Sequence, residues 1–143
     1  MKYWLLKSEP DLWSISQQKK AGSKGTTWDG VRNYQARNNL MKMKNGDHCF
    51  FYHSVKEKQI VGTVSVIGEH RPDPTDVSGR FGVVVIKAIE EVSNFVTLKN
   101  MKSNDKLSDL ALIKQSRLSV VPVSKAHWEI ICNMANISID RYK

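Results

Sequence analysis

The sequence predicts an α+β fold in which a strongly curved or barrel-like mixed sheet packs against several short helices. Apolar and β-branched runs recur between turn residues, which is typical of strands. Polar stretches of helical character lie between them, but the two kinds of segment do not alternate in a βαβ rhythm. The chain has 143 residues, of which 41% are hydrophobic and 25% are charged. This is enough to bury one core, so we expect a single domain over residues 1–143.

The N-terminal part of the chain predicts a strand, a helix and a loop. Residues 3–7 form an apolar and aromatic run that ends at a turn, which indicates a strand. We expect a helix to start near residue 10, with Leu12 and Ile15 on its inner face. Residues 17–27 are rich in Lys, Gly, Ser and Thr and predict a mobile basic loop.

The rest of the chain predicts four strands and further helical segments. These elements are a helix from about residue 31 to residue 45, strands at 48–53, 59–67, 81–91 and 118–123, a weak helical pattern over 96–112 and a closing helix over 124–135. The strand at 48–53 lacks polar–apolar alternation, so we expect it to be buried on both faces. Polar residues 54–58 make a hairpin connection, an irregular loop runs from Pro72 to Gly79, and Ser124 is a candidate helix N-cap.

Composition favours a polyanionic partner only modestly, because a lysine-rich surface also serves solubility, and it gives no sign of a membrane or redox function. The formal net charge is +8, and a basic surplus favours phosphate contacts, although the lysines are scattered along the chain. Cys49 and Cys132 lie in apolar surroundings and are expected to be buried, reduced thiols. The N-terminal apolar run is too short for a signal peptide or a membrane span. We therefore expect a cytoplasmic protein that does not bind membranes.

No metal or cofactor site is expected. The four histidines do not have the spacing of metal ligands. The chain has no P-loop, no GxGxxG or GxSxG motif and no catalytic Cys–His pattern.

Residues 28–39 form the segment richest in planar hydrogen-bonding groups. The segment opens with Trp28 and contains a carboxylate, several amides and two guanidinium groups. Asn33 and Arg37 are four residues apart, so they share a helix face. Trp28 either stacks on a nucleobase, which is worth about 1–3 kcal/mol per base, or anchors the core, and the sequence favours neither. Tyr34 is open to the same two interpretations.

Three further groups lie where strands are expected to end or begin, and clefts form at such rims. Lys7-Ser8-Glu9 follows the first strand, so Glu9 is a candidate acceptor for a base edge, although the motif by itself is explained better by a capped turn with two solvated charges. His53-Ser54 ends a buried strand, where a histidine is more often structural. Arg117 precedes a strand and either pairs with phosphate or forms an internal salt bridge with Asp29 or Glu9.

These residues together resemble the EVE domain family over nearly the whole chain. The resemblance rests on the segments at residues 3–10, 28–38, 51–54, 72–74 and 117–120, of which the Trp28 segment is highly specific. It implies a PUA-like fold, a curved β-barrel of five or six strands with short helices around it. It also implies kinship with YTH domains, which read methylated adenine in RNA, and with ASCH domains. By this likeness Lys7–Glu9 and Trp28-Asp29 match the positions with which YTH-type pockets hold a modified base, and residues 51–62 line the pocket. YTH cages use additional aromatic residues, for which the sequence offers no counterpart.

We therefore expect a non-enzymatic, monomeric module that binds a modified nucleobase in DNA or RNA, single-stranded or flipped out of a duplex. The residues expected around the base are Lys7, Ser8, Glu9, Trp28, Asp29, Asn33, Tyr34, His53 and Ser54. Those expected on phosphates are Arg37, Arg117, Lys19, Lys20 and Lys24. Two alternatives stay open. One is a small ASCH-like hydrolase of modified nucleosides that uses Lys7 and Glu9, although no nucleophile is paired with an orienting base. The other is a plain interaction module.

Overall fold

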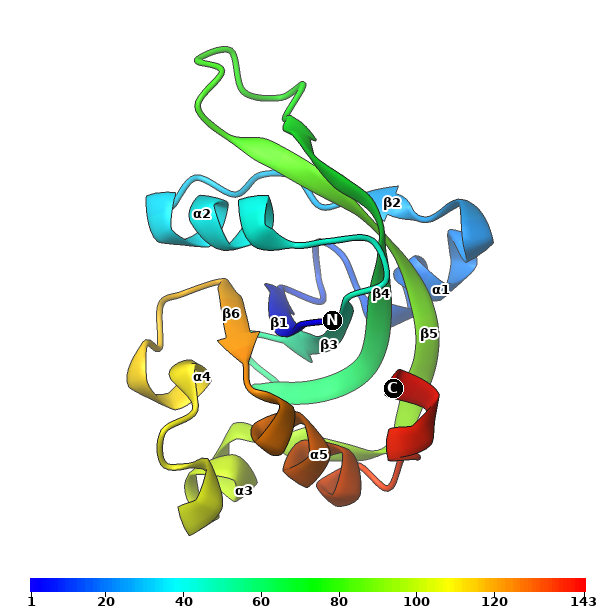
Figure 1. The fold of residues 1–143 in the computed structure, drawn as a ribbon, viewed down its shortest axis with the longest axis vertical. Helices are drawn as coiled ribbons and strands as arrows, with labels where there is room; N and C mark the ends of the chain where they lie inside the picture. Colours follow the sequence, from blue (N-terminus) through cyan, green and yellow to red (C-terminus); the bar gives the residue numbers. More distant parts are fainter.

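The structure, a computed structural model, describes all residues from 1 to 143 and consists of one curved sheet surrounded by short helices (Figure 1). The strands are β1 (Tyr3–Ser8), β2 (Thr26–Thr27), β3 (His48–His53), β4 (Gln59–Pro72), β5 (Gly82–Thr97) and β6 (Val120–Val123). The helices are α1 (Ile15–Lys20), α2 (Tyr34–Lys42), α3 (Leu98–Lys102), α4 (Ala111–Lys114) and α5 (Lys125–Met134), with 3-10 turns η1 (Gly22–Lys24), η2 (Asp105–Leu107) and η3 (Ile139–Tyr142).

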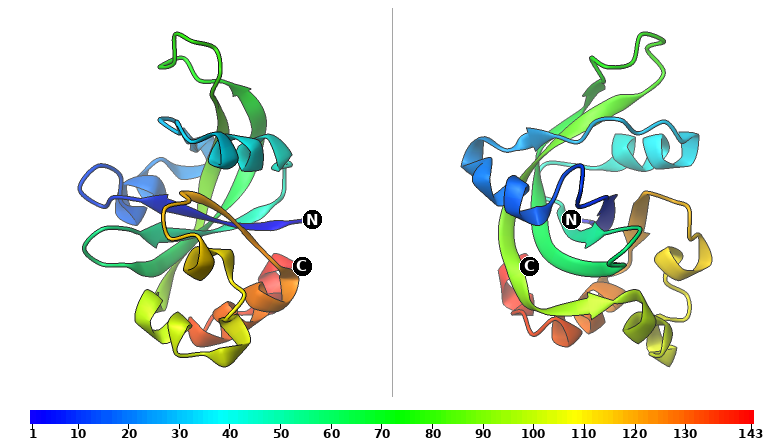
Figure 2. Two further views of the ribbon diagram at one scale, coloured as in Figure 1. Left: turned by 90° about the vertical axis from the view of Figure 1, so that its left-hand side faces the viewer. Right: turned by 180° about the vertical axis from the view of Figure 1, so that it is seen from behind.

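The six strands form one mixed sheet in the order β2-β5-β4-β3-β1-β6. β1 and β3 run parallel, and the other neighbours are antiparallel. The long strands β4 and β5 bend strongly around the other elements (Figures 1 and 2). The edge strands β2 and β6 do not pair with each other, so the sheet is open. The predicted α+β class is confirmed, and so is a curved sheet of five or six strands, which has six strands and is open at its edges.

The core lies on both faces of β3, because the adjacent residues Phe50 and Phe51 are both fully buried. On one face the ring of Trp128 stacks on Phe50 with ring centroids 3.8 Å apart and on Tyr3 at 4.6 Å. Trp4 is also buried, and its indole N–H donates to Asp47 Oδ2 at 3.1 Å. Both tryptophans are thus core residues.

Most predicted strands are confirmed, but the helices of the N-terminal half differ from the prediction. The first helix begins at Ile15 and not near residue 10, because Ser14 and Gln17 form a capping box there. Leu12 lies outside the helix and is 73% exposed, so its expected inward position is wrong. The segment predicted as a basic loop contains the C-terminal part of α1 together with η1 and β2. The next helix begins at Tyr34, because Asn33 caps it.

Two other expectations can be compared directly with the structure. Cys49 and Cys132 are free and buried, as predicted. Ser124 caps α5 through a hydrogen bond that its hydroxyl accepts from the His127 amide. None of the helices combines the length and the apolar character needed to span a membrane.

Candidate nucleic-acid interface

A cavity of about 620 Å³ opens at the C-terminal end of β1. Its wall consists of residues 7–9, 12–13, 26–33 and 119. The two segments that the sequence singled out, Lys7–Glu9 and the start of the Trp28 segment, therefore face one cavity although about twenty residues separate them. Its volume lies within the range of about 300–1,000 Å³ that is usual for small-ligand sites.

Trp28 is both a core residue and part of the cavity wall. It is 8% exposed, its backbone N–H donates to the Val84 carbonyl at 2.8 Å, and its ring meets Phe51 edge to face with centroids 5.6 Å apart. The two interpretations that the sequence left open for Trp28 are thus compatible. Packing against Phe51 fixes the Trp28 ring before any ligand binds. Stacking of a ligand on this ring would therefore cost the protein little side-chain entropy.

Trp13 is a second aromatic residue in the cavity wall, and the sequence did not assign it. Its indole N–H donates to Gln18 Oε1 at 2.8 Å. The Gln18 side chain is buried, accepts a hydrogen bond from the Thr26 hydroxyl at 3.0 Å and donates to the Ile86 carbonyl at 3.3 Å. Gln18 thus fixes the orientation of Trp13 relative to β2 and β5.

Ser8 stabilises the turn that carries Trp13 into the cavity wall. Its hydroxyl donates to the Trp13 carbonyl, while the Glu9 carbonyl accepts from the amides of Leu12 and Trp13 at 2.9 Å each. These bonds close the turn over residues 9–13 and bring Trp13 back to the end of β1. The Ser8 hydroxyl therefore supports the wall, which differs from the direct base contact expected from the sequence.

Lys7 is part of the cavity wall, and its ammonium group is held by residues outside the wall. Its Nζ donates to the Ser116 carbonyl at 2.7 Å and lies 6.0 Å from the centroid of the Tyr52 ring. No carboxylate lies within 4.0 Å of it, and burial lowers the pKa of Lys7. Lys7 can therefore donate to a carbonyl or an anionic oxygen of a ligand.

Glu9 and Asp29 add two carboxylates to the wall. Both are exposed, and neither side chain forms a hydrogen bond or an ion pair within the protein. The salt bridge to Arg117 that the sequence allowed for is absent, and Arg117 instead lies exposed beside a separate hollow. The carboxylates are thus free to accept hydrogen bonds from N–H groups of a ligand.

Asn33 is part of the same wall, but its side-chain oxygen already has a structural role. Its Oδ1 accepts from the Ala36 amide at 2.9 Å and caps α2. Only the Nδ2 group is left for a ligand. Because Asn33 lies before the first turn of the helix, it does not share a helix face with Arg37 in the way that the sequence suggested.

Three residues expected at the base do not line this cavity. His53 is buried, its Nε2 accepts from the Ile15 amide at 3.1 Å, and its Nδ1 pairs with Glu57 Oε1 at 2.9 Å. The hydrogen bond from His53 lowers the pKa of Glu57. Ser54 continues the β1–β3 pairing through its amide, which donates to the Ser8 carbonyl at 2.9 Å. Tyr34 lies outside, with its ring 5.2 Å from that of Phe81. Residues 51–62, expected to line the pocket, contribute none of its wall.

The residues expected on phosphates are spread over several faces. Lys19 is paired with Glu91 at 3.0 Å, while Lys20 and Lys24 are exposed on α1 and η1. Arg37 lies on α2 next to Tyr34. The structure therefore gathers part of the expected base site into one cavity but does not bring the expected phosphate contacts together.

Comparisons with known proteins point in one direction. The profile of the EVE domain family matches residues 2–134. Human thymocyte nuclear protein 1 is 30% identical over 92% of this chain and 73% of its own length. A solved structure of a Rhodopseudomonas palustris protein is 46% identical, with a TM-score of 0.90 over 95% of this chain and 94% of that one.

Two further structures bear on function and fold. The human THYN1 protein has been solved in complex with 5-methylcytosine-containing DNA; it is 29% identical, with a TM-score of 0.88 over 96% of this chain and 99% of that one. An ASCH protein of Zymomonas mobilis shares 8% identity and a TM-score of 0.56, over 94% of this chain and 99% of that one, a likeness of fold alone.

Proposed function

The chain belongs to the EVE domain family, and from this premise we propose that it binds DNA by taking one modified base into the cavity at the end of β1. The observation that carries the proposal is the composition of the cavity wall. Two tryptophans, one lysine and two residues with unpaired carboxylates line a space of about 620 Å³. The complex of the human THYN1 protein with 5-methylcytosine-containing DNA supports DNA as the partner.

The wall is chemically suited to a cytosine ring. Cytosine presents an exocyclic amino group, which donates hydrogen bonds, and a carbonyl, which accepts them. Glu9 or Asp29 accepts from the amino group, and Lys7 donates to the carbonyl. A thymine lacks the amino group and would leave a carboxylate without its donor, which costs more than the loss of a contact.

The base reaches the cavity from a single strand or by leaving the duplex. Extrusion of a base costs a few kcal/mol, and stacking on Trp28 at about 1–3 kcal/mol offsets part of that cost. Trp13, on the same wall, supplies a second apolar surface for the ring or for its modification.

The sharpest test replaces the unpaired carboxylates, because these side chains have no partners in the protein to disturb. The Glu9→Gln and Asp29→Asn variants are compared with Asp105→Asn, an exposed carboxylate on η2 outside the cavity. Binding is measured by fluorescence anisotropy on single- and double-stranded oligonucleotides that carry cytosine, 5-methylcytosine or thymine at one position. We expect the preference for the modified cytosine to fall in the cavity variants and to persist in the control.

A Trp28→Phe variant, which keeps an aromatic ring against Phe51, separates stacking from folding, and Trp28→Ala gives the full loss. Equal binding of all oligonucleotides by the wild type would refute the proposal. Tighter binding of an RNA strand than of DNA would show that RNA, and not DNA, is the partner. Release of a product from a modified nucleoside, lost in Lys7→Ala, would show a hydrolase instead.

A further inference from the structure

The hairpin between β4 and β5 extends well beyond the body of the protein as an arm (residues 72–81; Figures 1 and 2). Its tip carries Val77, which is fully exposed. None of the arm residues lines the cavity, so the proposed base site does not use the arm. The arm is nevertheless joined to the cavity wall, and its contacts indicate what it binds.

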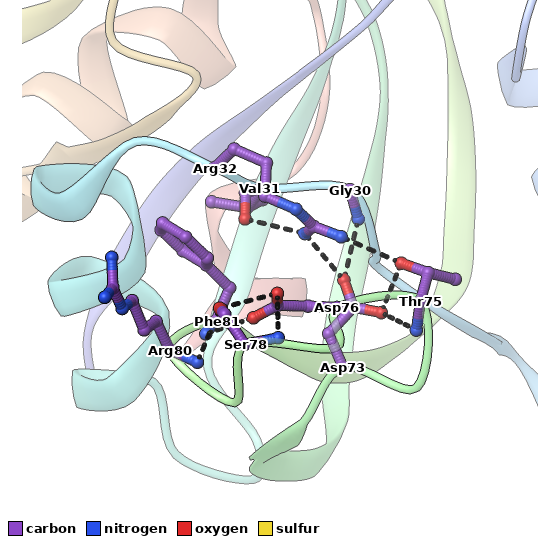
Figure 3. Close-up of polar contacts among 9 residues, drawn as sticks. All are labelled: Gly30, Val31, Arg32, Asp73, Thr75, Asp76, Ser78, Arg80 and Phe81. Carbon is purple, nitrogen blue, oxygen red and sulfur yellow. Dashed lines mark hydrogen bonds and ion pairs between the residues drawn. The ribbon is translucent and has the colours of Figure 1, made fainter.

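The Asp73 carboxylate fastens the arm to the Trp28 segment (Figure 3). Its Oδ2 accepts from the Gly30 amide and from Arg32 Nη1, both at 3.0 Å. Its Oδ1 accepts from the amide and the hydroxyl of Thr75 at 2.8 and 2.6 Å. Because Gly30 and Arg32 line the cavity, the arm and the cavity wall are held in a fixed relation.

The tip of the arm is organised by Asp76 in the same way (Figure 3). Its carboxylate accepts from the amide and the hydroxyl of Ser78 at 2.9 and 2.7 Å and from the Phe81 amide at 2.9 Å. Both aspartates of the arm thus have their oxygens occupied by local donors. Neither aspartate is therefore free to act as a counterion for Arg37 and Arg80, the two arginines near the base of the arm.

Arg37 of α2 and Arg80 of the arm meet at the Tyr34 side chain. The Arg37 guanidinium carbon lies 4.9 Å from the Tyr34 ring centroid, and Arg80 Nη1 lies 3.4 Å from the Tyr34 hydroxyl. Arg37 Nη1 also approaches the Arg80 carbonyl at 3.5 Å, and its Nε and Nη2 donate to Asn38 Oδ1. Arg80 Nε and Nη2 have no partner in the protein, and no carboxylate lies within 4.0 Å of either guanidinium.

Two guanidinium groups that share one phenol without a counterion repel each other, and an anion between them relieves that repulsion. Arg32, by contrast, is already neutralised by Asp73 at 3.0 Å. A phosphate is the anion that such forked donors bind best. Tyr34 follows directly on Asn33 of the cavity wall, so a strand with a base in the cavity has its backbone close to this pair.

We propose that Arg37 and Arg80 together bind one backbone phosphate of the DNA strand whose base enters the cavity. The inference rests on the proposed function, and it adds the arm as a second contact that holds the strand. Asp73 and Asp76 are positioning residues, because their hydrogen bonds hold the arm in the conformation that places Arg80 next to the Tyr34 hydroxyl. The contact does not depend on base identity, because phosphates carry no sequence information.

The test compares two double variants with equal loss of charge. Arg37→Ala/Arg80→Ala removes the pair, and Lys99→Ala/Lys102→Ala removes two exposed cations on α3, at the opposite end of the molecule from the arm (Figure 1). Binding of an unmodified and a 5-methylcytosine duplex is measured over a series of salt concentrations. Thermal unfolding is followed by circular dichroism to show that both variants fold.

For the arginine variant we expect the slope of log K against log salt to become shallower by about 1, the value for one phosphate contact, on both duplexes alike. The ratio of modified to unmodified binding should stay at the wild-type value. The lysine variant should leave the slope nearly unchanged. An equal change in both variants, or none in the arginine variant, would overturn the proposal.

The two proposals fail in distinguishable ways. If the wild type showed no preference for the modified base, the proposed function would fall while the slope still reported on the arginine pair. Inorganic phosphate at constant ionic strength should weaken DNA binding by the wild type more than by the arginine variant, because the free anion and the strand compete for the pair; equal weakening in both would count against the strand contact.

Discussion

Replacement of Asp73 by asparagine is expected to destabilise the protein at neutral pH, and the size of the effect follows from four hydrogen bonds. The two side chains have the same shape, so the asparagine oxygen can still accept from Thr75. Its amide nitrogen would face the Gly30 amide and the Arg32 guanidinium, which are both donors. Two hydrogen bonds to a charged acceptor are therefore lost and replaced by donor–donor contacts.

Each lost bond to a buried carboxylate is worth about 1.5–3 kcal/mol, but Arg32 is 41% exposed and can turn to water, which reduces its share. We expect a loss of about 2–3 kcal/mol in the free energy of unfolding. Circular dichroism in urea at pH 7 measures it, with Asp105→Asn as the control at an exposed carboxylate.

The same variant makes a prediction about pH. Burial alone raises the pKa of Asp73, but the hydrogen bonds from Thr75, Arg32 and Gly30 outweigh burial and hold the pKa well below its ordinary value of 3.8. A pKa lowered by folding stabilises the native state above the ordinary pKa, and this stabilisation is lost as the pH falls toward the lowered value. The difference between wild type and Asp73→Asn should stay constant from pH 7 to about 5 and shrink below about pH 4. A difference under about 0.5 kcal/mol at pH 7, or one that grows in acid, would refute the reasoning.

Three further predictions concern the core and the cavity. Gly25→Ala should destabilise the protein by about 2 kcal/mol or more in urea, because Gly25 has φ +71° and an added Cβ would lie 2.3 Å from the Ile86 carbonyl oxygen; unchanged stability would contradict this. Burial raises the pKa of Cys132 to about 12 and also raises that of Cys49, so a thiol reagent at pH 8 should label neither thiol until the protein is denatured, and rapid labelling of the native protein would be the contrary result. Lys7→Met should weaken oligonucleotide binding about tenfold at pH 7 without loss of stability. Because burial lowers the pKa of Lys7, the difference in affinity between wild type and variant should decline at a lower alkaline pH than it would for an exposed lysine. A difference in affinity that does not change with pH would argue against a charged contact.

The strands were predictable because their signal is local, whereas part of the first helix was not. Residues 48–53 form an unbroken apolar run and are a strand, and Ser124 lies where an N-cap is expected. The start of α1 was misplaced because Pro10 outweighed the Ser14–Gln17 capping box, although the box is visible in the sequence. The loop expected after it is partly helical because Gln18 makes tertiary hydrogen bonds that no local pattern reveals.

The two main segments of the cavity wall could be predicted from the sequence, whereas Trp13 and the contacts of Asp73 with the wall could not. Lys7–Glu9 and the Trp28 segment were paired by family resemblance, and the structure brings them to one wall. Trp13 was missed because the bond to Gln18 decides which way its indole points. Asp73 was missed because its contacts with Gly30 and Arg32 span more than 40 residues, and only the folded chain brings them together.

Under the proposed function, the separation of charge between the cavity and the arm would allow a basic protein to be selective as well. The cavity wall carries Glu9 and Asp29, which would repel a phosphate, while Arg37 and Arg80 meet at Tyr34, the residue after the wall residue Asn33, without a counterion. A strand can satisfy both groups only if its base turns toward the carboxylates and its backbone toward the arginines. Affinity then depends on salt through the phosphate contact, whereas selectivity depends on hydrogen bonds at the base edge, which salt screens far less. Because the two contributions rest on different residues, selectivity should persist at salt concentrations where most of the affinity has been lost.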